Sequence, residues 1–157
     1  GDRDGVRTPM QWSGDRNAGF SRCEAEQCFA APVMNPRAPY QAVNVESQEH
    51  APNSPLNWMK RIINLRRRHK VFGRGSLQLL EAENRRVLSF LRVFEDQHVL
   101  VVGNLSRFAQ PVAIDLAAYR GWTPVEMFGH TRFPPVGDGL YPLALGPHNF
   151  YWFKLER

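Results

Sequence analysis

The stretch Val87-Leu88-Ser89-Phe90-Leu91-Arg92-Val93-Phe94 decides the fold class of the C-terminal half of the chain. It is rich in aliphatic and aromatic residues, and a second apolar run, residues 99–102, follows after Glu95-Asp96-Gln97. Two apolar runs of strand length on either side of a short polar turn are typical of a β-hairpin. We therefore expect two antiparallel strands joined by a turn at residues 95–97.

Further strand patterns continue toward the C-terminus. They cover residues 112–116, 125–128, 141–145 and 150–155, and glycine and proline residues separate them. In the first and third of these segments, large apolar residues alternate with smaller or charged ones, as expected of strands with one buried face. Six or seven short strands with such turns predict a mainly β fold, an antiparallel β-sandwich over residues 76–157.

Residues 54–71 carry the pattern of one amphipathic helix. Asn53 or Ser54 can cap its start, Pro55 suits its first turn, and Gly73 and Gly75 lie beyond its end. Its apolar side chains form a stripe at Leu56, Trp58, Met59, Ile62, Ile63 and Leu65. Such a stripe needs an apolar partner, and we expect the sandwich to cover part of it.

Residues 1–52 form a long irregular segment that several prolines interrupt. A loop of this length inside a compact domain is usually functional or covers a neighbour. It opens with Arg3-Asp4-Gly5-Val6-Arg7-Thr8-Pro9-Met10-Gln11-Trp12, and Asn17-Ala18-Gly19-Phe20 follows soon after. Because large apolar residues stand here among charges and turn residues, we expect this segment to pack over a scaffold that precedes it.

This opening resembles the loop after the eighth strand of the catalytic barrel in the α-amylase superfamily (glycoside hydrolase family thirteen). Four further stretches resemble the same enzymes in the same order, namely residues 40–46, 56–61, 72–75 and 104–112, and the aromatic run at 150–153 follows them. Within the superfamily, the resemblance is to the trehalose synthases, a family of maltose–trehalose isomerases. Any one of these stretches is weak evidence, but together they span nearly the whole chain.

The resemblance implies two domains. Residues 1–75 are expected to be a remnant of a (β/α)8 barrel, with residues 1–52 as its last strand-to-helix loop and residues 54–71 as its final helix. Residues 76–157 are expected to be the C-terminal β-sandwich domain. The partner of the chain would then be the missing catalytic barrel of a parent enzyme that interconverts maltose and trehalose.

The sequence points to no catalytic residue in this chain. Retaining cleavage of a glycosidic bond needs two carboxyl groups about 5–5.5 Å apart, and the resemblance places these on barrel strands that are absent here. It places Arg7, Asp4 and Arg3 at the active-site entrance, where they are candidates for substrate binding in the parent. The alternative is an ion pair, Arg7–Asp4 or Arg3–Asp15, that only folds the loop. We expect this chain alone to be inactive.

We expect neither a cofactor nor a metal site. Cys23 and Cys28 are the two cysteines, and free thiols in a cytoplasmic protein are favoured over a local disulfide. No stretch approaches the roughly 20 apolar residues of a membrane span. The formal net charge is +5, but the excess is concentrated on the helix and its end, between Leu56 and Arg74, as one solvated cationic face. Neither a membrane nor a nucleic-acid partner is therefore expected.

The sequence leaves three alternatives open. The parent could be an α-glucosidase that hydrolyses its substrate, because product choice depends on the missing barrel. The chain could be a free-standing carbohydrate-binding β-sandwich, with Trp122, Trp152, Tyr141 or Tyr151 as stacking platforms. A nucleic-acid module that uses the basic helix is the third, and its binding would fall steeply with salt.

Overall fold

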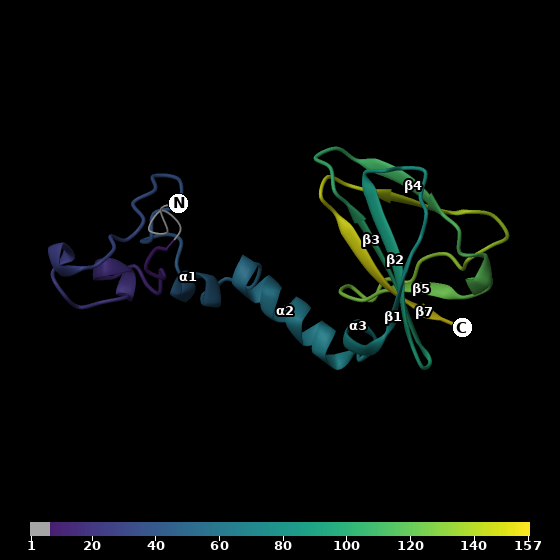
Figure 1. Cartoon of the computed structure of the whole chain (residues 1–157), viewed down its shortest axis with the longest axis horizontal. Coiled ribbons are helices and arrows are strands. Elements are labelled where there is room, and N and C mark those ends of the chain that lie inside the picture. The colour runs from purple at the N-terminus through teal and green to yellow at the C-terminus, as the bar shows by residue number, and fades with distance from the viewer. Residues whose placement is uncertain (1–6) are drawn as a thin grey trace. The chain divides into compact units, whose positions relative to one another are not determined.

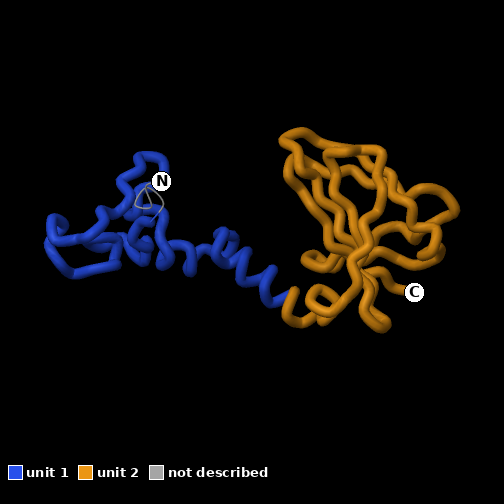
Figure 2. Tube along the Cα trace, viewed as in Figure 1, with its two compact units in different colours: residues 1–65 blue, residues 66–157 orange. Residues whose placement is uncertain are grey.

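The computed structural model of the chain describes residues 7–157. The chain divides into two compact units, residues 1–65 and residues 66–157 (Figure 2). The first unit holds the short 3₁₀ turns η1 (Arg16–Gly19) and η2 (Ala25–Gln27), the helix α1 (Val45–His50) and most of α2 (Pro55–Arg68). The end of α2, the short helix α3 (Val71–Arg74) and all seven strands of the described residues belong to the second unit.

The second unit is an antiparallel β-sandwich (Figure 1). Its strands are β1 (Ser76–Leu79), β2 (Val87–Phe94), β3 (Gln97–Asn104), β4 (Gln110–Ile114), β5 (Thr123–Glu126), β6 (Tyr141–Leu145) and β7 (Phe150–Glu156). Five of them form one sheet in the order β1-β2-β3-β7-β5, and β4 pairs with β6 in a second sheet. The expected mainly β fold is confirmed.

The hairpin predicted around residues 95–97 is formed by β2 and β3. Phe94 pairs with Gln97, so the turn consists of Glu95 and Asp96 and is one residue shorter than expected. Glu95 adopts a left-handed conformation (φ 53°), which a tight turn between two strands requires. Because the turn is shorter, β3 begins at Gln97, before the apolar run of residues 99–102 on which its prediction was based.

The core lies between the two sheets. In β4 and β6 every second residue is buried, and these side chains pack with those of β2, β3 and β7 in one cluster. Phe153 and Leu100 are fully buried members of this cluster. β3 is buried on both faces along residues 99–102, because α3 covers the outer side of the β2–β3 pair. Continuous burial of this kind explains why β3 reads as an unbroken apolar run.

One buried amide joins two loops of the sandwich, the β3–β4 loop and the β6–β7 loop. The Asn104 side chain donates to the carbonyl oxygens of Phe108 (2.7 Å) and Gly146 (2.8 Å). Its own oxygen accepts from the backbone N–H and the hydroxyl of Ser106, both at 2.9 Å. Asn104 is therefore satisfied as donor and acceptor, as a buried polar group must be.

The helix predicted over residues 54–71 is present as α2, but its end differs from the prediction. Ser54 is the cap, since its hydroxyl accepts from the backbone N–H of Asn57 (3.2 Å). However, α2 ends at Arg68, and residues 71–74 form the separate helix α3. No residue of α2 is fully buried, and Met59 and Ile63 are about half exposed. That the sandwich covers part of the apolar stripe stays a prediction.

Candidate functional site

The candidate site is the irregular segment over residues 7–52, and a left-handed turn shapes its first part. Asn17, Ala18 and Gly19 all have positive φ angles (52°, 59° and 66°). Glycine suits position 19 because its φ is strained for other residues, and a Cβ there would also crowd the hydroxyl oxygen and backbone nitrogen of Ser13. Three consecutive left-handed residues are costly, and such strain is characteristic of functional segments.

Hydrogen bonds hold this turn in place. The backbone N–H groups of Trp12 and Ser13 both donate to the carbonyl of Ala18, at 2.9 and 3.1 Å. The buried Asn17 amide donates to the carbonyls of Ser21 (3.2 Å) and Cys23 (2.8 Å). Asn17 is thus a turn residue, as the sequence indicated. Trp12 is 50% exposed, and its packing against a scaffold that precedes this chain stays a prediction.

The short helix α1 is tied to the same segment, and the sequence analysis missed it. Asn44 and Ser47 form a capping box: the Asn44 side chain accepts from the Ser47 N–H (2.8 Å), and the Ser47 hydroxyl accepts from the Asn44 N–H (3.3 Å). The N–H groups of Val45 and Glu46 donate to the carbonyls of residues 11 and 12. The first free donors of α1 are therefore satisfied by the opening stretch itself.

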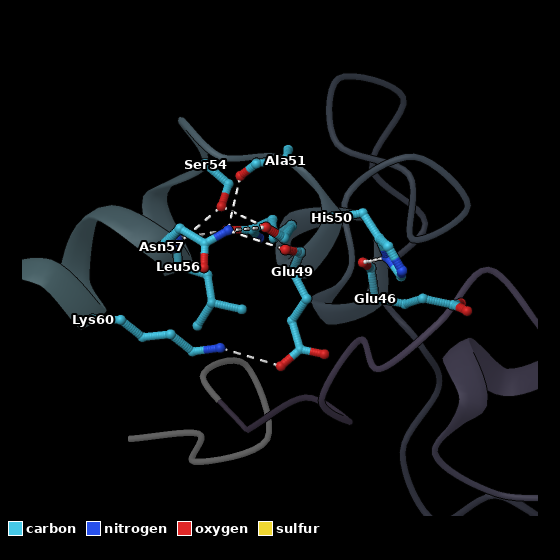
Figure 3. Close-up of polar contacts among 9 residues, drawn as sticks. Glu46, Glu49, His50, Ala51, Ser54, Leu56, Asn57 and Lys60 are labelled. Carbon is cyan, nitrogen blue, oxygen red and sulfur yellow. Dashed lines mark hydrogen bonds and ion pairs between the residues drawn. The ribbon is translucent and has the colours of Figure 1, made fainter.

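A second polar cluster joins α1 to α2 (Figure 3). The Asn57 amide donates to the carbonyls of Gln48, Glu49 and Ala51, at 3.0, 3.1 and 2.9 Å. Ser54 donates to the Gln48 carbonyl (2.6 Å) while it caps α2. One asparagine and one serine thus satisfy the carbonyls at the end of α1 and set the turn into α2.

A cavity of about 490 Å³ lies beside the left-handed turn. Arg7, Phe20 and Phe29 line it together with both cysteines, and most of its surface is apolar. Phe29 is 99% exposed, so the cavity is open to solvent. The structure therefore places the candidate Arg7 at an open cavity. The other two candidates, Asp4 and Arg3, lie outside the described residues.

The two cysteines meet at this cavity. They are free thiols, and their sulfur atoms are 3.1 Å apart. The Ser21 hydroxyl donates to the sulfur of Cys23 (3.1 Å) and lowers the pKa of that thiol below its usual value. The hydrogen bond with Cys23 raises the pKa of Cys28. Sequence separation alone does not reveal this contact, which depends on the 3₁₀ turn between the two residues.

Two carboxylates near the left-handed turn make local contacts. Asp15 accepts from the Ser13 hydroxyl (2.9 Å), and Glu24 pairs with Arg16. Within residues 7–157, no group of three or more histidine, cysteine or acidic residues could hold a metal ion. In the same residues, no helix has the length and apolar character to cross a membrane.

The four candidate stacking residues of the sandwich are buried or pack against other aromatic rings, Tyr151 against Phe153. Tyr141 is buried, and Trp122 meets Tyr119 edge-on at a centroid distance of 5.2 Å. Half-buried Trp152 packs at a tilt against Phe72, 4.8 Å between ring centroids. A sugar-binding platform needs an exposed ring face, so this geometry disfavours the free-standing carbohydrate-binding module.

Comparisons with known proteins agree with this geometry. Residues 1–75 match the family model of the α-amylase catalytic domain, and residues 77–152 match that of the maltogenic amylase C-terminal domain. The chain belongs to the α-amylase family. Over 99% of its length it is similar to the trehalose synthase of Thermus thermophilus, at 52% identity, and to the trehalose synthase/amylase TreS of Mycobacterium tuberculosis, at 46%.

The chain spans only 16% of the Thermus protein and 26% of the mycobacterial one, so it corresponds to a small part of larger trehalose synthases. Among solved structures, isomaltulose synthase from Klebsiella sp. LX3 is similar over 98% of this chain and 26% of its own, with 28% identity and a TM-score of 0.70. Trehalose-6-phosphate hydrolase of Bacillus licheniformis is similar in fold over 99% of this chain and 26% of its own (TM-score 0.73, 23% identity).

Proposed function

We propose that this chain is part of an α-amylase-family enzyme that interconverts maltose and trehalose. The observation that carries the proposal is the 52% identity to a trehalose synthase over 99% of the chain. The oligo-1,6-glucosidases that it resembles are more distant, at 33% identity for one of Bacillus subtilis over 67% of the chain. This difference favours the isomerase over a hydrolase.

In this proposal residues 1–75 belong to the catalytic barrel and residues 76–157 form a supporting β domain. The half-exposed apolar stripe of α2 supports the assignment of residues 1–75 to the barrel, because an apolar helix face of this kind is stable when it packs against a partner. Barrel strands of the parent would be that partner. The two free thiols are consistent with a reducing compartment, and the cytoplasm is the proposed location.

Arg7 is the candidate contact to substrate that the described residues offer. It lines the open cavity beside the left-handed turn, and a guanidinium can donate paired hydrogen bonds to neighbouring sugar hydroxyls. Asp4 and Arg3 precede it in the same stretch and are proposed to share this role. Loops at this end of a barrel carry the functional groups, so the segment would form the lip of the active site.

Activity assays on maltose test the proposal. The longer enzyme that carries this chain is expected to produce trehalose, whereas the 157-residue chain alone is expected to produce neither trehalose nor glucose above the blank. Release of glucose without trehalose by the longer enzyme would support the hydrolase instead. Turnover by the isolated chain would contradict the absence of catalytic residues from it.

Substitution of Arg7 tests the proposed contact. In the longer enzyme, Arg7→Ala is expected to lower kcat/KM for maltose by about 10- to 100-fold, since a charge-assisted hydrogen bond contributes about 1.5–3 kcal/mol. Arg37→Ala changes an exposed arginine of the same segment and is the matched control. Equal effects of the two substitutions would contradict a specific role for Arg7.

A further inference from the structure

Cys23 and Cys28 lie on either side of η2, which turns the backbone back on itself. The N–H of Gln27 donates to the carbonyl of Glu24 (2.9 Å), and that of Cys28 donates to Ala25 (3.2 Å). These bonds bring the two sulfur atoms to 3.1 Å. Bonded sulfurs lie about 2.05 Å apart, so an approach of about 1 Å would join them.

The surroundings give the two thiols different roles. Ser21 stabilises the thiolate of Cys23 by its hydrogen bond, which lowers the pKa of that thiol, and the charge of Arg16 acts in the same direction. The pKa of Cys28 is raised by its bond to Cys23. Both side chains are partly exposed. Cys23 is therefore the better nucleophile, and Cys28 is placed to attack its sulfur in a second step.

We propose that Cys23 and Cys28 form a reversible dithiol–disulfide site that reacts with low-molecular-weight disulfides. The Cys23 thiolate attacks one sulfur of the small disulfide, breaks its S–S bond and releases one small thiol. The Cys28 thiolate then attacks the Cys23 sulfur and releases the second small thiol. The protein dithiol loses two electrons and two protons, and the small disulfide is reduced to two thiols.

Oxidation of the two thiols would restrict the movement of the cavity wall that they form. Both cysteines line the cavity together with Arg7, and the Asn17 amide bonds the Cys23 carbonyl at 2.8 Å. A disulfide closes a ring over residues 23–28 and restricts that part of the wall next to the left-handed turn. The chemistry itself needs neither a saccharide nor the catalytic barrel, so it stands or falls separately from the proposed function.

The test is to incubate the reduced 157-residue chain with oxidised glutathione, alkylate the remaining thiols, and measure intact and peptide masses. The expected product has lost two hydrogen atoms, carries no alkyl group, links Cys23 to Cys28, and returns to the dithiol with dithiothreitol. A stable product with two glutathione adducts, a cross-linked dimer, or two thiols that remain open to alkylation would overturn the proposal.

Single substitutions test the two roles. Cys28→Ser is expected to trap one glutathione on Cys23, and this adduct should form at least about threefold faster than the adduct on Cys28 in the Cys23→Ser variant. Ser21→Ala should slow the reaction of Cys23 while leaving Cys28 unchanged. Equal rates in the two single-cysteine variants would contradict the assignment of Cys23 as nucleophile.

A denatured control separates native proximity from mere closeness in sequence. In concentrated urea the 3₁₀ turn is lost, so the ring-closing step in the wild-type chain should slow by about tenfold. Ring closure at the same rate in urea would show that the folded segment does not position the pair, and would refute the proposal.

Discussion

Different kinds of interaction stabilise the fold within residues 66–157 and within residues 7–65. The largest fully buried side chains, Phe153, Leu100 and Ile114 among them, all belong to the first region. In the second, the buried residues are Asn17, Ala18, Asn44 and Ser54, each of which caps a helix or lies in the left-handed turn. One region is stabilised by apolar burial, whereas the other is ordered mainly by hydrogen bonds between side chains and backbone.

This difference corresponds to the two family matches. Residues 77–152 match a C-terminal domain model and bury their own core. Residues 1–75 match a catalytic-domain model and leave Met10, Phe20 and Met59 at least half exposed. About 65 residues can support a core of their own only marginally. Exposed apolar side chains in that region are therefore consistent with a segment that packs against more of its domain.

The largest expected effect comes from truncating the sandwich core. Phe153→Ala should lower the free energy of unfolding of the β domain by about 3–5 kcal/mol, because it leaves a large cavity among fully buried neighbours. Phe29→Ala makes the same chemical change at a ring that is 99% exposed and should stay within about 0.5 kcal/mol. Urea unfolding followed by tryptophan fluorescence measures both, and equal losses would remove the contrast between the regions.

A smaller effect is expected at the buried amide of the sandwich. Asn104→Ala leaves the carbonyls of Phe108 and Gly146 without their donor and should cost about 1–3 kcal/mol in the same unfolding assay. Ser106→Ala removes one hydroxyl partner of that amide and should cost about 1 kcal/mol or less. If Ser106→Ala cost more than Asn104→Ala, the amide would not be the centre of this network.

The smallest effect on global stability is expected at the α1–α2 junction. Asn57→Ala removes three hydrogen bonds to the end of α1 and should speed amide exchange in residues 45–50 about 5- to 30-fold, equivalent to about 1–2 kcal/mol. Asn64→Ala, on the exposed side of the same helix, is the control. The unfolding midpoint of the β domain should not move with either, and a shift would mean that the two regions unfold together.

Much of the sandwich follows from local sequence. Strands such as β4 and β6 alternate residue by residue, and their large side chains make that period visible in the sequence. The turn of the β2–β3 hairpin was placed one residue too long, because Gln97 is as polar as the turn that precedes it. The end of α2 was placed three residues too late, since no proline or glycine stands at Arg68.

The candidate site was less accessible from sequence. α1 has only six residues, but its Asn44-x-x-Ser47 spacing is a capping signal that could have revealed it. The left-handed turn runs through Ala18, a residue that disfavours positive φ, so propensity argues against it. The contact between Cys23 and Cys28 depends on the path of the backbone between them. The roles of Arg7, Asp4 and Arg3 remain a prediction.

Hydrogen–deuterium exchange of the 157-residue chain tests the contrast between the two regions most directly. The account predicts slow exchange in β2, β3 and β7, limited by global unfolding of the sandwich, and fast exchange across residues 7–65 with only modest protection in α1 and α2. Exchange across residues 7–65 as slow as in β3 would contradict it, because that segment would then hold a stable core of its own.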